Sequence, residues 1–159
     1  MGIDPGTATT GYGIIDVADG QKYALVECGL VSTPKELEHG KRLDMIFEKI
    51  GGIIDKFRPQ EVAIERLFFA TNALTAIAVG QAIGVTKLAI HKKGLPVFDY
   101  APMQVKLMIG GSGKADKTVI KATIKKLFNL REKKGERTHF DNTADALAIA
   151  VCHARKTGL

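Results

Sequence analysis

The sequence predicts an α/β domain, built on a mixed five-stranded sheet with helices on both faces. The first 32 residues contain three short apolar runs separated by turn residues, which is typical of an antiparallel meander. After residue 61, strand-like runs alternate with helical patterns, which favours parallel strands joined by helices. The 159 residues, 45% hydrophobic and 25% charged, fit one globular domain without repeats or an interdomain linker, so residues 1–159 are expected to form a single domain.

The strands are expected at residues 3–4, 13–17, 23–32, 61–67 and 96–100, where β-branched and other apolar residues are concentrated. The Asp19-Gly20 pair predicts a hairpin turn between the second and third strands. Pro34 is expected to end the meander. The three N-terminal strands therefore form the antiparallel part of the sheet.

Helices are expected at residues 37–57, from 71 or 72 to about 93, at 103–109, after the capping residue Asp116, and at 141–155. Pro59 and Gly94 are the predicted stop signals of the first two helices. In the helix after Asp116, the apolar face is expected to contain Val119, Ile120, Ile124 and Leu127. The charged segment 130–139 is expected to be loose.

Gly80 and Gly84 lie four residues apart, on one face of the second predicted helix. Each glycine weakens a helix by about 1 kcal/mol relative to alanine. Close packing of this face against another element or another subunit is the expected compensation.

The chain is basic, with a formal net charge of +6 and a pI of about 9.3, which favours a polyanionic partner. Its two cysteines, Cys28 and Cys152, do not form a disulfide or zinc pattern and are expected to be free thiols. The apolar stretches are interrupted before they reach membrane-spanning length, and the N-terminus does not fit a signal peptide. The expected location is the cytoplasm, without a membrane partner.

Three acids stand in segments that are otherwise apolar: Asp4 in the first strand, Glu65 in the fourth and Asp145 in the last helix. Taken singly, each could be a surface or capping carboxylate; Asp4 precedes Pro5-Gly6 as in an ordinary turn, or in a turn that wraps a nucleotide phosphate. If the last helix crosses the sheet, the three acids converge. Hard cations such as Mg²⁺ bind oxygen clusters of this kind, and two ions roughly 4 Å apart can drive hydrolysis at phosphorus.

The chain resembles the RuvC family of bacterial Holliday-junction resolvases, in the RNase H-like superfamily. The resemblance covers nearly the whole chain and is carried by these segments, in order: Gly2-Ile3-Asp4-Pro5-Gly6 with Gly11-Tyr12-Gly13, Ala63-Ile64-Glu65 followed by Phe68, Gly80-Gln81-Ala82 with Gly84-Val85, Gln104-Val105-Lys106, and Ala144-Asp145-Ala146-Leu147-Ala148-Ile149-Ala150. It implies a single RNase H-like nuclease domain and a homodimer. The implied activity is an endonuclease that nicks four-way DNA junctions symmetrically in recombination and repair. The implied cofactor is Mg²⁺ or Mn²⁺, two ions per active site, and the implied partner is the branch-migration helicase complex RuvAB.

By position, the resemblance assigns Asp4, Glu65 and Asp145 to the catalytic, metal-binding acids. The fourth position of that set is Asn142, where the family has Asp or in some members His. A carboxamide oxygen can touch a metal ion, but it carries no charge and cannot act as a base. Asp141 could replace it by a small rotation of the helix. An Asp→Asn change that impairs cleavage is the simpler interpretation.

The resemblance also implies DNA-binding residues. Lys106 and Lys117 match basic residues near the scissile phosphate, and Lys114 lies on a glycine-flanked loop that can reach backbone phosphates. Phe68 is implied as a wedge that stacks on an unpaired base at the junction centre. Three of the four histidines, His91, His139 and His153, show no metal-ligand pattern and are expected at the surface or at helix ends.

Two other functions remain open from the residues alone. The strand-turn-strand beginning with Asp4, Gly6 and Thr7 also occurs in actin-like ATPases, but those proteins need two such domains and a second phosphate loop. A protein that binds DNA junctions without cutting them is the second alternative, and Asn142 is the observation that favours it.

Overall fold

The computed structural model describes residues 1–18, 22–66, 73–130 and 137–159, with only the backbone for residues 73 and 137–140. Its sheet has five strands in the order β3-β2-β1-β4-β5. The antiparallel meander consists of β1 (Gly2–Asp4), β2 (Thr9–Ala18) and β3 (Lys22–Ser32). Strands β4 (Val62–Glu65) and β5 (Val97–Tyr100) continue the sheet in parallel with β1. The predicted mixed sheet is confirmed, whereas the predicted Asp19-Gly20 turn and the caps at 71 and 72 lie outside the described residues.

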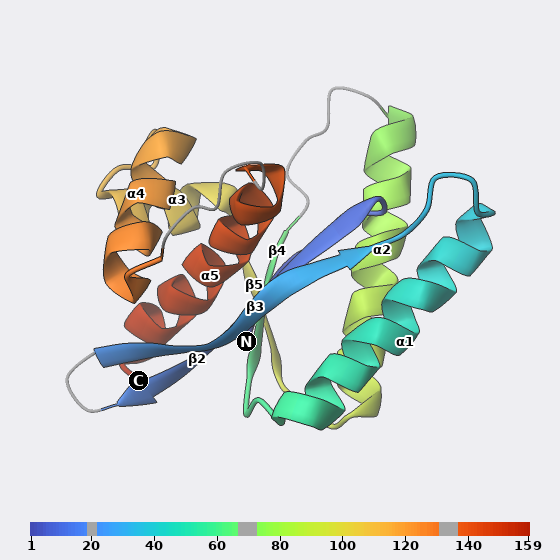
Figure 1. The fold of residues 1–159 in the computed structure, drawn as a ribbon, viewed down its shortest axis with the longest axis horizontal. Helices are drawn as coiled ribbons and strands as arrows, with labels where there is room; N and C mark the ends of the chain where they lie inside the picture. Colours follow the sequence, from blue (N-terminus) through green and yellow to red (C-terminus); the bar gives the residue numbers. More distant parts are fainter. Residues whose placement is uncertain (19–21, 67–72, 131–136) are drawn as a thin grey trace.

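The helices cover both faces of the sheet (Figure 1). On one side lie α1 (His39–Phe57) and α2 (Ala73–Lys92). On the other lie α3 (Pro102–Gly110), α4 (Lys117–Phe128) and α5 (Arg137–Thr157). Successive strand residues point to opposite faces, so Ile3 and Ile64 enter the core beneath α1 and α2, whereas Ala63 enters the core beneath α5.

Three predicted helix ends agree with the structure. Helix α1 ends at Phe57, just before Pro59, and Arg58 takes the left-handed conformation (φ 47°) while its N–H binds the Ile54 carbonyl at 2.8 Å. Gly94, which follows α2, also has a positive φ of 72°. The Asp116 side chain caps α4 by accepting a hydrogen bond from the Thr118 N–H at 2.7 Å.

Three expectations were wrong. Helix α5 begins at Arg137, so residues 137–139 are helical rather than loose. Val119 is exposed on α4, because only part of the apolar face of this helix is buried against the rest of the protein. His153 is only 4% exposed rather than at the surface.

The buried His153 joins α5 to the sheet. Its Nε2 atom lies 2.7 Å from Glu61 Oε2, its Nδ1 atom lies 2.8 Å from the Tyr100 hydroxyl, and its ring packs on Phe98 with 4.5 Å between centroids. A buried imidazole is tolerated because both ring nitrogens have partners. This network fixes the C-terminal half of α5 against the start of β4 and the end of β5.

Helix α5 packs closely on β1 and β2, and at two glycines the helix backbone lies directly on the strand backbone. A Cβ atom added to Gly2 would collide with the Ala146 carbonyl, and one added to Gly11 would collide with the Asn142 carbonyl. At Gly13, an added Cβ would lie 2.6 Å from a Leu147 methyl carbon. Glycine is needed at these strand positions because it lets a helix backbone approach closely.

We expect Gly11→Ala to lower the free energy of unfolding by about 1–3 kcal/mol, because the added methyl group meets a helix carbonyl that cannot move aside like a flexible side chain. The matched control is Gly52→Ala on the exposed side of α1, where an added Cβ meets nothing within 4 Å. That change should stabilise the protein by up to about 1 kcal/mol, since alanine favours helices. Urea unfolding of both variants measures the two signs, and equal stability of Gly11→Ala and the parent would contradict this account of the contact.

Candidate active site

The ends of two neighbouring parallel strands bring Asp4 and Glu65 together. Strands β1 and β4 pair in register through Gly2 with Ala63 and Ile3 with Ile64. One residue further along each strand stand Asp4 and Glu65. Because residues two apart point to the same face, both acids share the face of Gly2 and Ala63, which is the face covered by α5.

Helix α5 adds Asn142 and Asp145 to the same edge of the sheet. The Asn142 carbonyl lies against Gly11, and Gly11 pairs with Asp4 between β2 and β1. Asp145 follows less than one helical turn later, between the fully buried Ala144 and Ala146. The glycine contact thus determines the position of both residues relative to Asp4.

The three acids lie within electrostatic range of one another. The pKa of Asp4 rises to about 6, first because of burial and then because of the Asp145 charge. The pKa of Glu65 rises to about 7, again mainly through burial, with further contributions from Asp4 and Asp145. Burial and neighbouring like charges both disfavour ionised carboxylates. Burial, together with the neighbouring like charges, therefore makes ionisation of Asp4 and Glu65 unfavourable in this structure.

Two predicted DNA-binding lysines face this cluster. Lys117 Nζ lies 3.1 Å from Asp145 Oδ2, and this carboxylate raises the pKa of the Lys117 ammonium. The positive charge of Lys106 acts on Glu65 by lowering its pKa. Lys114 is exposed in the segment between α3 and α4. The remaining predicted residue, Phe68, lies outside the described residues.

Asp141 does not join the acids. Its carboxylate forms an ion pair with Lys121 of α4 at 2.5 Å. Asn142 is the residue whose backbone is packed against the sheet at the cluster. In the structure as it stands, Asp141 therefore does not take the place of a carboxylate at position 142.

The ligand atoms of the cluster are of the kind that a hard divalent cation prefers, but the side chains are not spaced to hold one in this structure. Its donors are all oxygens, which Mg²⁺ and Mn²⁺ prefer, and a bound cation would favour the ionised form of its two buried acids, whose pKa values are raised. Within the part of the chain that the structure describes, however, no three His, Cys, Asp or Glu side chains are arranged to hold a metal ion. The acids therefore share one edge of the sheet without forming a closed set of metal ligands among the described residues.

The raised pKa of Glu65 predicts how stability depends on pH. Folded protein keeps a proton on Glu65 up to about pH 7, whereas unfolded chain loses it near the ordinary value of 4.5. Stability without metal should therefore fall as pH rises between about 4.5 and 7. Glu65→Gln removes this loss, so at pH 8 in EDTA the variant should be more stable than the parent by about 2 kcal/mol.

Urea unfolding at pH 4.5 and pH 8 measures this difference. Asp16→Asn, which changes an exposed acid of β2, is the control and should alter stability little at either pH. A Glu65→Gln advantage of the same size at both pH values would show that Glu65 is not destabilised by its charge.

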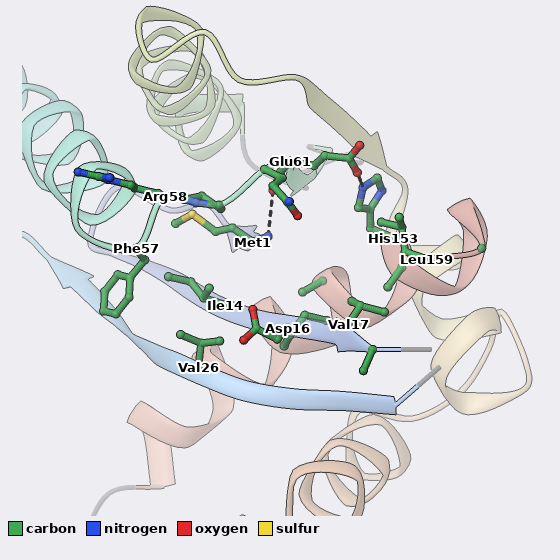
Figure 2. Close-up of a pocket in the computed structure, with 17 residues that line it drawn as sticks. Met1, Ile14, Asp16, Val17, Val26, Phe57, Arg58, Glu61, His153 and Leu159 are labelled. Atoms are coloured by element: carbon green, nitrogen blue, oxygen red, sulfur yellow. Dashed lines mark hydrogen bonds and ion pairs between the residues drawn. The ribbon is translucent and has the colours of Figure 1, made fainter. Parts of the chain in front are cut away.

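A well-formed groove among the described residues lies elsewhere. This groove of about 950 Å³ lies at the opposite end of the sheet, where Met1, Ile14, Arg58, Glu61 and His153 are among its lining residues (Figure 2). Glu61 stands at the start of β4 and Glu65 at its end, so the groove and the acid cluster are separated by the length of the strand. Of the two acidic side chains that line the groove, Asp16 and Glu61, the second is already paired with His153. The groove and the acid cluster are therefore separate features of the fold.

A mixed sheet of this order, covered by helices on both faces, places the chain in the RNase H-like class of folds. Residues 1–153 match the family described as crossover junction endodeoxyribonuclease RuvC. The chain belongs to the RuvC family.

Relatives and solved structures agree with this assignment. The chain is 46% identical to crossover junction endodeoxyribonuclease RuvC of Pelotomaculum thermopropionicum, over 97% of this chain and 91% of that protein. It is 45% identical to the protein of the same name from Thermotoga maritima, over 97% and 89% of the two chains. Its fold matches T. thermophilus RuvC in complex with a Holliday junction substrate with a TM-score of 0.87 and 33% identity, covering 98% of this chain and 92% of that one.

Proposed function

We propose that this chain is a metal-dependent endonuclease that resolves four-way DNA junctions in recombination and repair. The convergence of Asp4, Glu65 and Asp145 at one edge of the sheet, in a member of the RuvC family, is the observation that carries this proposal. The family assignment supplies the reaction class, which is phosphodiester hydrolysis. In this proposal, the acids of the chain bind the metal ion and its lysines bind the phosphates of the DNA.

Asp4, Glu65 and Asp145 would hold the cation, which we propose to be Mg²⁺ or Mn²⁺ at two ions per site. When bound, such ions activate the attacking water and stabilise the leaving oxygen. Lys106, Lys117 and Lys114 would attract and neutralise the phosphates near the cut, since phosphate contacts dominate affinity for DNA. Asn142 is the weak point of this set, because an uncharged amide attracts a second divalent ion less than a carboxylate does.

A protein that holds junctions and cuts them slowly is the second candidate for this particular sequence. Asn142 favours it, together with the engagement of the adjacent Asp141 by Lys121. Loss of one negative charge should leave attraction to DNA unchanged or slightly stronger. Binding and cutting are therefore separable in this chain.

Parallel binding and cleavage assays test the proposal. Binding to a labelled four-way junction in Ca²⁺ is compared with binding to a linear duplex of the same arms, and cleavage is then followed in Mg²⁺ and in Mn²⁺. We expect clear preference for the junction, with slow, symmetric nicks. Equal affinity for junction and duplex would overturn the proposed substrate.

We further propose that the chain acts as a homodimer through α2. This helix exposes Leu74, Ile77 and Leu88, and nothing lies within 4 Å of a Cβ added at Gly80 or Gly84. Small residues beside exposed apolar ones suit close approach of a second helix, and a two-fold protein suits a four-way substrate. By length and composition alone, Leu74–Lys92 could cross a membrane, contrary to the expectation that the apolar stretches are interrupted before that length. A dimer interface through α2 would account for this composition without a membrane.

Changing Ile77 to Glu should convert the dimer to a monomer at micromolar concentration, because a charge would be buried at the interface. Leu107→Glu on α3 is the matched control: the two side chains are 60% and 58% exposed, but they lie on opposite faces of the sheet. Sedimentation velocity reports the mass of each. A parent chain that sediments as a monomer would refute the dimer, and a dimer that survives Ile77→Glu would place the interface elsewhere.

Two further proposals rest on family membership. RuvAB, the branch-migration helicase complex, is the proposed protein partner, and the cytoplasm is the proposed location. The net charge of +6 supports a role on DNA in general without distinguishing these partners.

A further inference from the structure

Two lysine–aspartate pairs join α4 to α5, and they are alike in chemistry but not in surroundings. Lys117 pairs with Asp145 at 3.1 Å, and Lys121 pairs with Asp141 at 2.5 Å. The lysines are four residues apart on one helix and the aspartates four residues apart on the other, so the pairs are neighbours along the same helix contact. Only Asp145 belongs to the cluster with Asp4 and Glu65.

The position of Lys117 is unfavourable for its own helix. It is the first residue of α4, immediately after the cap Asp116. The N-terminal end of a helix carries a partial positive charge, so a lysine there is disfavoured by the helix itself. What favours the ammonium at this place is the acid cluster, since Asp145, Asp4 and Glu65 all attract it.

The Lys117 and Asp145 side chains differ in how exposed they are to solvent. The Lys117 side chain is 70% exposed, whereas that of Asp145 is 20% exposed and stands in a helix whose neighbouring alanines are buried. An ion pair with so exposed a lysine contributes little to stability. The lysine can therefore leave a carboxylate that stays in place.

We propose that Lys117 is a placeholder cation: it neutralises Asp145 while the acid cluster holds no divalent ion, and it must release Asp145 when such an ion binds. The release would make the ammonium available to a DNA phosphate at the same edge. Metal binding and the lysine–phosphate contact then favour each other, and this coupling is reciprocal. The inference rests on the proposed function, because it assumes that the acids bind metal.

Metal binding without DNA tests it. Titration of the chain with Mn²⁺ at pH 8, with free Mn²⁺ measured by electron paramagnetic resonance, gives the affinity of the chain and of two variants. We expect Lys117→Met to bind Mn²⁺ about three- to tenfold more tightly, since the competing ammonium is gone. Lys121→Met removes the same charge from the neighbouring pair and should change the affinity less than twofold.

Unchanged or weaker Mn²⁺ binding by Lys117→Met would overturn the placeholder role and leave the proposed function standing. An equal gain in both variants would also overturn it, because net charge rather than occupation of Asp145 would then be the cause. Failure of all three proteins to bind Mn²⁺ at millimolar concentration would overturn both the inference and the assignment of the acids to metal. These outcomes separate the two proposals.

Discussion

Changing Asn142 to Asp is expected to raise the rate of junction cleavage about 100-fold or more. The added carboxylate restores one negative charge to a cluster that must hold divalent ions, and such ions contribute several kcal/mol to stabilising the transition state. Each 1.36 kcal/mol corresponds to a factor of ten in rate. Single-turnover cleavage of a four-way junction in Mg²⁺ measures the effect directly.

Asp141→Asn is the matched control for this gain. In the parent chain it should leave the residual cleavage unchanged, because the Asp141 carboxylate is held by Lys121 on the neighbouring helix. A parent that already cuts at the rate of the Asn142→Asp variant would refute the prediction. If Asp141→Asn then abolished that activity, Asp141 would be identified as the residue that replaces the missing acid.

In the restored Asn142→Asp background, changing Asp4 or Asp145 to Asn, or Glu65 to Gln, should lower cleavage by a factor on the order of a thousand. Binding to the junction in Ca²⁺ or EDTA should stay near its parental value, because removal of negative charge does not weaken attraction to phosphate.

Asp16→Asn serves as the control for a general effect of charge, since Asp16 is an exposed acid at the far end of β2. It should cut like the restored enzyme. Normal cleavage by any of the three amide variants would remove that residue from the proposed metal-binding set. Parallel loss of binding and cleavage would instead indicate a damaged fold.

The order and type of the strands and helices could be predicted from periodicity and turn residues alone. So could the unusual character of Asp145, because a carboxylate in a run of buried alanines requires an explanation. Gly2, Gly11 and Gly13 let the helix that contains Asp145 pack closely on the sheet. That these three glycines lie on one face of the sheet can be recognised only once the strand boundaries are known.

Contacts between distant segments could not be predicted. His153 was expected at the surface because its partners, Glu61 and Tyr100, are 92 and 53 residues away. The predicted start of α5 is too late, because the first residues of this helix lack the apolar spacing by which a helix is recognised in a sequence. The Lys117–Asp145 ion pair depends on how α4 packs against α5. The four-residue spacing of two lysines on α4 and of two aspartates on α5 does not by itself predict that packing.

The contact between α5 and the sheet has a consequence for how this fold can vary. Where side chains interlock, a change on one surface needs a matching change on the other. At Gly2 and Gly11 the opposing surfaces are mainly backbone, which is chemically the same in every protein. A last helix taken from a divergent relative should therefore fit this sheet at these two positions, whereas the contacts of Leu147 and His153 with the strands would need matching partners.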